Sequence, residues 1–240
     1  MMASNRILSL LSDVALLFPV FLLVFTFKGF FQALSAKLMG DDTAQQDGFL
    51  TLNPLAHIDI FGLTTTILVF FFVGGLLGDS LPRAILFILL ITFGARWTVP
   101  VTIDDRNFKH YKLGGIITAL SGSFGNFVLA AVAIACMKIL LAFSLPKYAA
   151  STLFELLRTL IDLSIIFGVL DLIPLPPFDG GRVLRYALPE SKQHIVAWLE
   201  EYSLFIVLVV FFLPGVSDLF FGCISSMSSL IKRGLFKLFF

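Results

Sequence analysis

Residues 113–137 read LGGIITALSGSFGNFVLAAVAIACM, an uninterrupted run without a formal charge. One helical span of a lipid bilayer needs about 20 predominantly apolar residues, so this run is predicted to be a transmembrane helix. The whole chain has a mean hydropathy of +0.97, and only 14% of its residues are charged, against about one quarter in soluble domains. The sequence therefore predicts an all-α, polytopic integral membrane protein.

Further apolar runs flank this helix. Residues 60–77 are nearly as long, and residues 14–27 form a span if the helix continues through Lys28 to about Leu38. Residues 149–175 are long enough to span but carry charges, whereas residues 84–95 are short and suit a partial or re-entrant segment. We expect about five to six transmembrane helices.

No polar linker divides the chain, so residues 1–240 are predicted to form a single membrane domain. Its core covers about residues 10–215, and residues 216–240 form a C-terminal helix that either crosses the membrane or lies in its interface. Pro100, within the β-branched segment 98–102, predicts a short re-entrant or β-like loop that lines protein or water. The formal net charge of +1 gives no indication of a nucleic-acid partner. The host membrane is not indicated by the sequence.

Several polar motifs interrupt the apolar chain. Residues 53–59 read NPLAHID, residues 99–101 read VPV, residues 122–126 read GSFGN, and residues 176–184 read PPFDGGRVL. In this order and spacing, the motifs resemble the short form of the site-2 protease family, which comprises intramembrane zinc metalloproteases without an inserted PDZ domain. The resemblance covers about residues 10–215.

The resemblance implies a zinc site whose key positions are altered in this chain. In the family two His and one Asp bind zinc, and a Glu beside the first His acts as the general base. Counting back from Gly40, the first His, the Glu and the second His correspond to Lys28, Gly29 and Gln32. The third ligand, Asp179, is retained, as is Asn126, the family residue thought to hold the substrate strand or the oxyanion. The family's Asn at position 171 is replaced by Asp171.

These replacements remove the chemistry of the site. A protonated Lys has no lone pair for zinc, a Gln amide is a poor ligand, and Gly29 offers no base. No catalytic residue and no metal or other cofactor is therefore expected. In the family site, the negative charges of Glu and Asp balance the two positive charges of Zn²⁺. In this chain, the positive charge of Lys28 balances the negative charge of Asp179. We hypothesise that the Lys28 ammonium occupies the metal position and pairs with Asp179, the alternative being that Lys28 extends to the membrane interface.

Three functions remain open from the sequence. The first is a catalytically inactive homologue that acts as a membrane-embedded binding or scaffold subunit in the bilayer. Its membrane-protein partner would lie in a groove formed by Asn126, Val99, Pro100, Asn53 and His57. The second is an active metalloprotease with an altered zinc site formed by His57, Asp59 and Asp179. The third is an ion or proton transporter that uses the intramembrane charges of Lys28, Asp162, Asp171 and Asp179.

Overall fold

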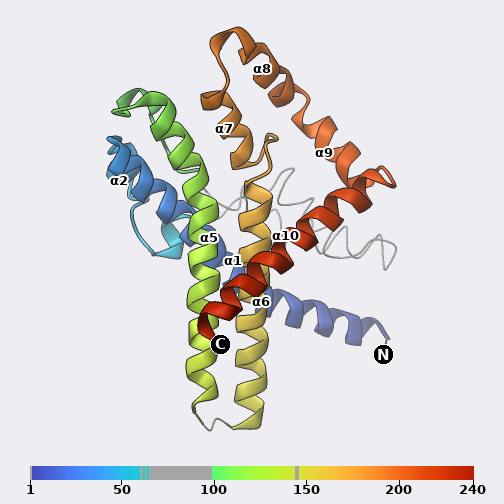
Figure 1. The fold of residues 1–240 in the computed structure, drawn as a ribbon. Helices are drawn as coiled ribbons and strands as arrows, with labels where there is room; N and C mark the ends of the chain where they lie inside the picture. The colour runs from blue at the N-terminus through green and yellow to red at the C-terminus, as the bar shows by residue number, and fades with distance from the viewer. Residues whose placement is uncertain (1, 60–61, 63, 65–98, 144–145) are drawn as a thin grey trace.

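The computed structural model describes residues 2–59, 62, 64, 99–143 and 146–240 (Figure 1). Within these ranges the chain is helical and forms no strand. The α-helices are α1 (Met2–Met39), α2 (Thr43–Gln46), α5 (Tyr111–Leu141), α6 (Lys147–Asp171), α7 (Asp179–Ala187), α8 (Gln193–Glu201), α9 (Ser203–Phe212) and α10 (Val216–Phe239). Three short 3-10 turns are η1 (Pro54–Ala56), η2 (Asp105–Asn107) and η3 (Glu190–Lys192).

Two described helical segments are long and apolar enough to cross a membrane, namely Leu16–Met39 and Tyr111–Leu141. A third span arises if Glu190–Glu201 and Phe205–Phe211 are counted together, although these helices meet at a bend of 63°. These segments agree with a membrane protein but do not establish five to six spans. The spans expected over residues 60–77 and 84–95 lie outside the described residues.

The core is the packing of α1, α5 and α6. Val20 and Val24 of α1 are buried against Ala130 and Ile134 of α5, together with apolar side chains of α6 such as Ile161. Lipid tails are as apolar as these side chains, so close packing rather than water exclusion holds such helices together. The three helices therefore fix the positions of the polar side chains between them.

The C-terminal helix α10 crosses α6 and extends to the lower part of α5 in Figure 1. Its buried Ile224 belongs to the same core cluster as α6, and Phe220, Ile231 and Phe236 pack against that cluster. The segment 216–240 is therefore an ordered part of the helical packing.

The β-like loop predicted over residues 98–102 has no strand in its described part. Residues 99–104 follow an irregular path, and the Val99 N–H donates to the His57 carbonyl at 3.1 Å. Pro100 has no N–H to donate to a strand partner, which explains why pairing stops there.

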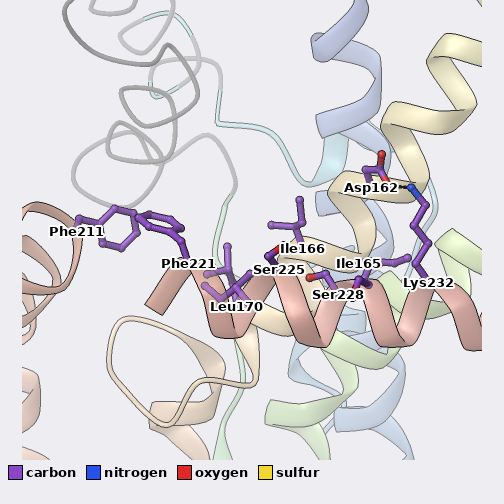
Figure 2. A pocket seen from close by; sticks show the side chains of 11 residues that line it. Asp162, Ile165, Ile166, Leu170, Phe211, Phe221, Ser225, Ser228 and Lys232 are labelled. Carbon is purple, nitrogen blue, oxygen red and sulfur yellow. Dashed lines mark hydrogen bonds and ion pairs between the residues drawn. The ribbon is translucent and has the colours of Figure 1, made fainter. Parts of the chain in front are cut away.

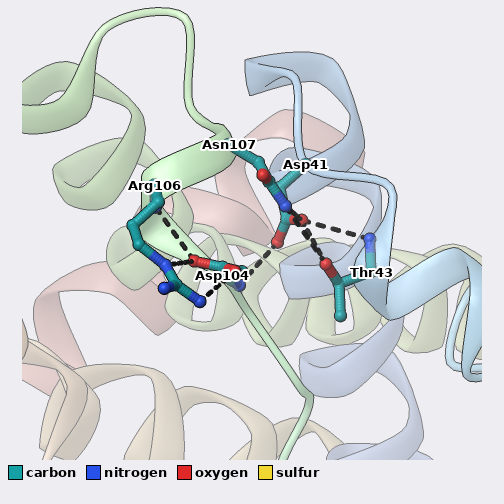
Figure 3. Close-up of polar contacts among 5 residues, drawn as sticks. All are labelled: Asp41, Thr43, Asp104, Arg106 and Asn107. Atoms are coloured by element: carbon teal, nitrogen blue, oxygen red, sulfur yellow. Dashed lines mark hydrogen bonds and ion pairs between the residues drawn. The ribbon is translucent and has the colours of Figure 1, made fainter.

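A buried carboxylate ties the end of α1 to the segment before α5 (Figure 3). Asp41 is fully buried, and its Oδ1 accepts hydrogen bonds from the Thr43 hydroxyl at 2.5 Å and from Asn107 Nδ2 at 3.0 Å. Its Oδ2 accepts from the backbone N–H of Asp104 at 2.9 Å. Burial acts to raise the pKa of Asp41, but these hydrogen bonds outweigh it and hold the pKa below its usual value.

Candidate functional site

The Lys28 side chain of α1 lies between two carboxylates. Its Nζ is 2.7 Å from Asp171 Oδ1 and 3.0 Å from Asp179 Oδ2. The Lys28 side chain is 22% exposed, whereas those of Asp171 and Asp179 are 6% and 11% exposed. Lys28 is therefore not extended toward an interface, because its ammonium is bonded inside the helix packing.

The turn between α6 and α7 brings the two carboxylates together. Asp171 is the last residue of α6, and Asp179 is the first residue of α7. The intervening chain turns back on itself, with Phe178 N–H donating to the Leu175 carbonyl at 2.9 Å. At the start of α7 the free backbone N–H groups favour a negative side chain, which suits Asp179.

Gln32 and Arg182 complete the polar cluster. Gln32 Nε2 donates to Asp179 Oδ2 at 2.9 Å, and Arg182 Nη1 lies 3.6 Å from Asp179 Oδ1. Two Asp carboxylates face one Lys and one Arg, so the formal charges in the cluster sum to zero. A neutral cluster avoids the large cost of an unpaired charge inside a membrane.

A glycine of α5 lets this cluster form. A Cβ at Gly122 would lie 2.9 Å from Gln32 Nε2, 3.1 Å from Lys28 Cγ and 3.3 Å from Asp179 Oδ2. A larger residue at position 122 would therefore force the Gln32 amide, or α5 itself, to move. The small side chain allows α1, α5 and α7 to approach one another closely.

Gly29, at the position of the family's general base, is covered by His57. A Cβ at Gly29 would lie only 2.5 Å from His57 Nδ1. His57 is 2% exposed, and its Nε2 is 2.9 Å from the Thr51 carbonyl oxygen. A carbonyl only accepts, so Nε2 carries the proton and Nδ1 presents a lone pair. No partner for Nδ1 is present among the described residues.

A cavity of about 200 Å³ adjoins the cluster. Its lining includes Lys28, Gln32 and Asp179 together with three residues of the predicted partner groove, His57, Val99 and Pro100. The other two predicted groove residues are placed elsewhere.

Asn53 and Asn126 do not line this cavity. Asn53 is exposed, and its Oδ1 accepts from the Leu55 N–H at 3.1 Å, where it caps η1. Asn126 is completely buried in α5, and neither its Oδ1 nor its Nδ2 has a hydrogen-bond partner in the described part of the chain. Of the five predicted groove residues, only His57, Val99 and Pro100 therefore line the cavity.

The side chains at the family's metal position do not form a zinc donor set. The Lys28 ammonium and the Gln32 Nε2 both point hydrogens at Asp179, the one retained carboxylate ligand. Zinc requires lone pairs from three or four side chains, and a cation there would meet the Lys28 charge. The alternative set of His57, Asp59 and Asp179 is not gathered either, because the described residues contain no group of three potential ligands.

Asp162 is not part of the Lys28 cluster. Its carboxylate accepts from Lys232 Nζ of α10. Asp162 and Asp171 are nine residues apart on α6, which corresponds to about 13 Å along a helix axis. The four charges of the predicted transport path are therefore divided between two ion-pair clusters.

Two residues of the cluster were not predicted as its members. Arg182 stands three residues after Asp179, so the helical i, i+3 spacing was a usable signal. Asp171 was noted as an altered family position near the site, but its pairing with Lys28 depends on the geometry of the turn that follows α6. Two of the departures from the family pattern, Lys28 and Asp171, are bonded to each other.

Comparisons with known proteins identify the family of the chain. The family model described as Peptidase family M50 matches residues 15–214. A relative from Bacillus subtilis (strain 168), named "Putative zinc metalloprotease YwhC", is 28% identical over 192 residues, which cover 79% of this chain and 77% of the relative. Among solved structures, none matches the chain significantly. The chain therefore belongs to peptidase family M50, the site-2 protease family.

Proposed function

We propose that this chain is a catalytically inactive member of the site-2 protease family that acts as a membrane-embedded binding or scaffold subunit. The observation that carries the proposal is the Lys28 ammonium, bonded to Asp171 at 2.7 Å and to Asp179 at 3.0 Å. An ammonium in this position neutralises the retained carboxylate and repels a divalent cation, so the chain needs no zinc for a stable fold.

The absence of a general base supports the same proposal. Gly29 has no side chain, and the space beside it is occupied by the His57 ring. The His57 lone pair does not replace the base, because Nδ1 has no solvent-accessible surface and packs against Gly29. No described group is therefore placed to activate a water molecule by the family mechanism.

For the binding role, the exposed chain at Val99 provides the surface that suits a partner. Val99 is 38% exposed at the edge of the cavity, and Arg182 is half-exposed beside it. An extended segment of a membrane protein would contact the irregular chain at residues 99–101 and place an acidic group near Arg182.

A cleavage assay tests the inactivity. The full chain is reconstituted in liposomes with a transmembrane test substrate, beside a family member with an intact His-Glu-x-x-His motif. The proposal expects no cleavage by this chain under conditions in which the active relative cleaves. Cleavage that is lost in Asp179→Asn would overturn it.

Site-specific photo-crosslinking tests the binding role. A photoreactive residue at Val101, which lines the cavity, is expected to give a discrete adduct with one membrane protein in the native membrane. The matched control is Val132 on the exposed surface of α5, which is expected to give diffuse lipid adducts. Identical adduct patterns at the two positions would contradict a partner at residues 99–101.

A further inference from the structure

A second cavity lies between α6, α9 and α10 (Figure 2). Its volume is about 480 Å³. None of the residues of the Lys28 cluster lines it, so it is a separate site. Pockets that hold small ligands have volumes of about 300–1,000 Å³.

One end of this cavity is apolar. Phe211 of α9 and Phe221 of α10 meet edge to face, with ring centroids 5.2 Å apart. Leu170 of α6 and the buried Ile224 of α10 continue the apolar wall. Apart from Ser225, which follows Ile224, this wall is apolar and therefore suits a hydrocarbon chain.

The other end is polar. Asp162 and Lys232 form an ion pair there, at the opposite end from Phe211 and Phe221 in Figure 2. The side chains of Asp162 and Lys232 are 38% and 34% exposed, so both charges remain accessible to a ligand. Between the two ends lies Ser228, whose Oγ is buried and has no hydrogen-bond partner among the described residues.

The order of groups along the cavity favours a lipid over a partner helix. An apolar wall that leads to one exposed ion pair matches an acyl chain that ends in a charged headgroup. A flexible acyl chain can follow this apolar wall.

We propose that the α6–α10 cavity binds one acyl chain of a zwitterionic phospholipid that carries a primary ammonium headgroup. The anionic phosphate of the lipid would bond to Lys232, and its cationic ammonium would bond to Asp162. Each exposed charge of the cavity would then face a headgroup charge of opposite sign. Ser228 precedes Lys232 by one helical turn toward the apolar end, where the ester group of the lipid would accept its hydroxyl hydrogen. This assignment does not depend on whether the Lys28 site is catalytically inactive.

Photo-crosslinking with a defined lipid tests the proposal. The full-length protein is reconstituted with phosphatidylethanolamine that carries a diazirine in its acyl chain, and adducts are mapped by mass spectrometry. We expect adducts on cavity residues such as Ile166, Leu170 and Ile224. The matched variants are Ser225→Phe, which fills the cavity, and Ser226→Phe, whose side chain is exposed on the same helix and does not line it.

Ser225→Phe is expected to lower the yield of cavity adducts about tenfold, equivalent to about 1.4 kcal/mol of binding free energy, whereas Ser226→Phe leaves it unchanged. If Ser225→Phe does not fold, as judged by its unfolding temperature, Ser229→Leu provides a second blocking variant. Equal adduct yields in the folded blocking variant and the parent would overturn the site. An adduct of these residues with a second protein would overturn it as well.

The headgroup assignment has its own measurement. Native mass spectrometry is expected to show retention of phosphatidylethanolamine over phosphatidylglycerol by the parent, and loss of this preference in Asp162→Asn. Equal retention of the two lipids by the parent would contradict the headgroup assignment.

Discussion

At the scale of single residues, the central feature is that Lys28 and Asp171 replace two family residues and bond to each other. Replacing Lys28 by Met leaves Asp171 and Asp179 close together without their cation. Removing one partner of a buried ion pair costs about 3–5 kcal/mol, so Lys28→Met is expected to lower the free energy of unfolding by that amount. Lys37→Met, an exposed position of the same helix, serves as the control with little effect.

The pairing of Lys28 with Asp171 predicts that Asp171→Asn changes the stability in opposite directions in the parent and in Lys28→Met. Asp171→Asn is expected to destabilise the parent protein, because Lys28 then loses its closer partner. In the Lys28→Met background, Asp171→Asn is expected to stabilise the protein, because it removes an unpaired carboxylate. A double-mutant cycle on detergent-purified protein measures this coupling, for which about 0.5–3 kcal/mol is typical. Additive effects of the two changes would contradict the pair.

Gly29 is expected to tolerate no side chain. A Cβ there would lie 2.5 Å from His57 Nδ1, and such overpacking costs about 1–3 kcal/mol. Gly29→Ala should therefore lower the unfolding temperature, and the same change should cost less in a His57→Ala background. Gly222→Ala is the matched control in another helix, because a Cβ there meets nothing within 4 Å. Equal unfolding temperatures for Gly29→Ala and Gly222→Ala would contradict the contact between Gly29 and His57.

The residue-scale features differ in how far the sequence could predict them. The proximity of Lys28 to Asp179 was implied by the resemblance to the family, whose zinc ligands correspond to these positions, together with a charge balance. The contact with Asp171 could not be predicted, since it depends on a turn of seven residues between α6 and α7 that no periodicity describes. The contact of His57 with Gly29 could not be predicted for a similar reason, because a loop residue has no regular sequence spacing relative to a helix.

At the scale of elements, the Asp41 hydrogen bonds attach the end of α1 to η2 and so to the start of α5. Because the pKa of Asp41 is lowered in the folded protein, the carboxylate contributes stability above its unfolded value of about 3.9. That contribution is lost as the pH falls through the lower, folded pKa. Protonation of Asp41 at a pH below its folded pKa should therefore weaken the connection between α1 and η2.

Hydrogen exchange checks this connection. As the pH falls from about 5 toward 1, backbone amides near Asp104 and Lys109 are expected to lose protection progressively, after correction for the intrinsic exchange rate. Asp41→Asn should show the loss already at pH 5, and Asp42→Asn, an exposed neighbour, should behave like the parent. Unchanged protection in Asp41→Asn would show that the carboxylate does not hold the two elements together.

The helices were predictable where their apolar runs are long. The run at 113–137 lies within α5, and the run at 14–27 extends into α1 through Lys28, as expected. The position of α10 was not predictable, because Phe220 and Ile224 pack against α6 for reasons of tertiary shape rather than local pattern. The β-like loop was inferred from β-branched residues, but residues 99–102 form no strand, although the Val99 N–H bonds to the His57 carbonyl.

At the scale of the whole molecule, the proposed loss of catalysis involves more than three motif positions. Restoring the motif in the triple variant Lys28→His, Gly29→Glu, Gln32→His places a Glu side chain where His57 now packs. We therefore expect this variant to remain without proteolytic activity and to unfold at a lower temperature than the parent. Efficient cleavage of a transmembrane substrate by the triple variant would show that the rest of the site has kept its catalytic geometry.

The most direct test of the account is the zinc content of the purified parent protein. The protein is expressed in zinc-supplemented medium, purified without chelators and analysed by elemental mass spectrometry beside Asp179→Asn. Because the Lys28 ammonium lies 3.0 Å from the retained carboxylate, the account predicts far less than one zinc per chain, with no difference between the two proteins. One zinc per chain in the parent, lost in Asp179→Asn, would contradict it.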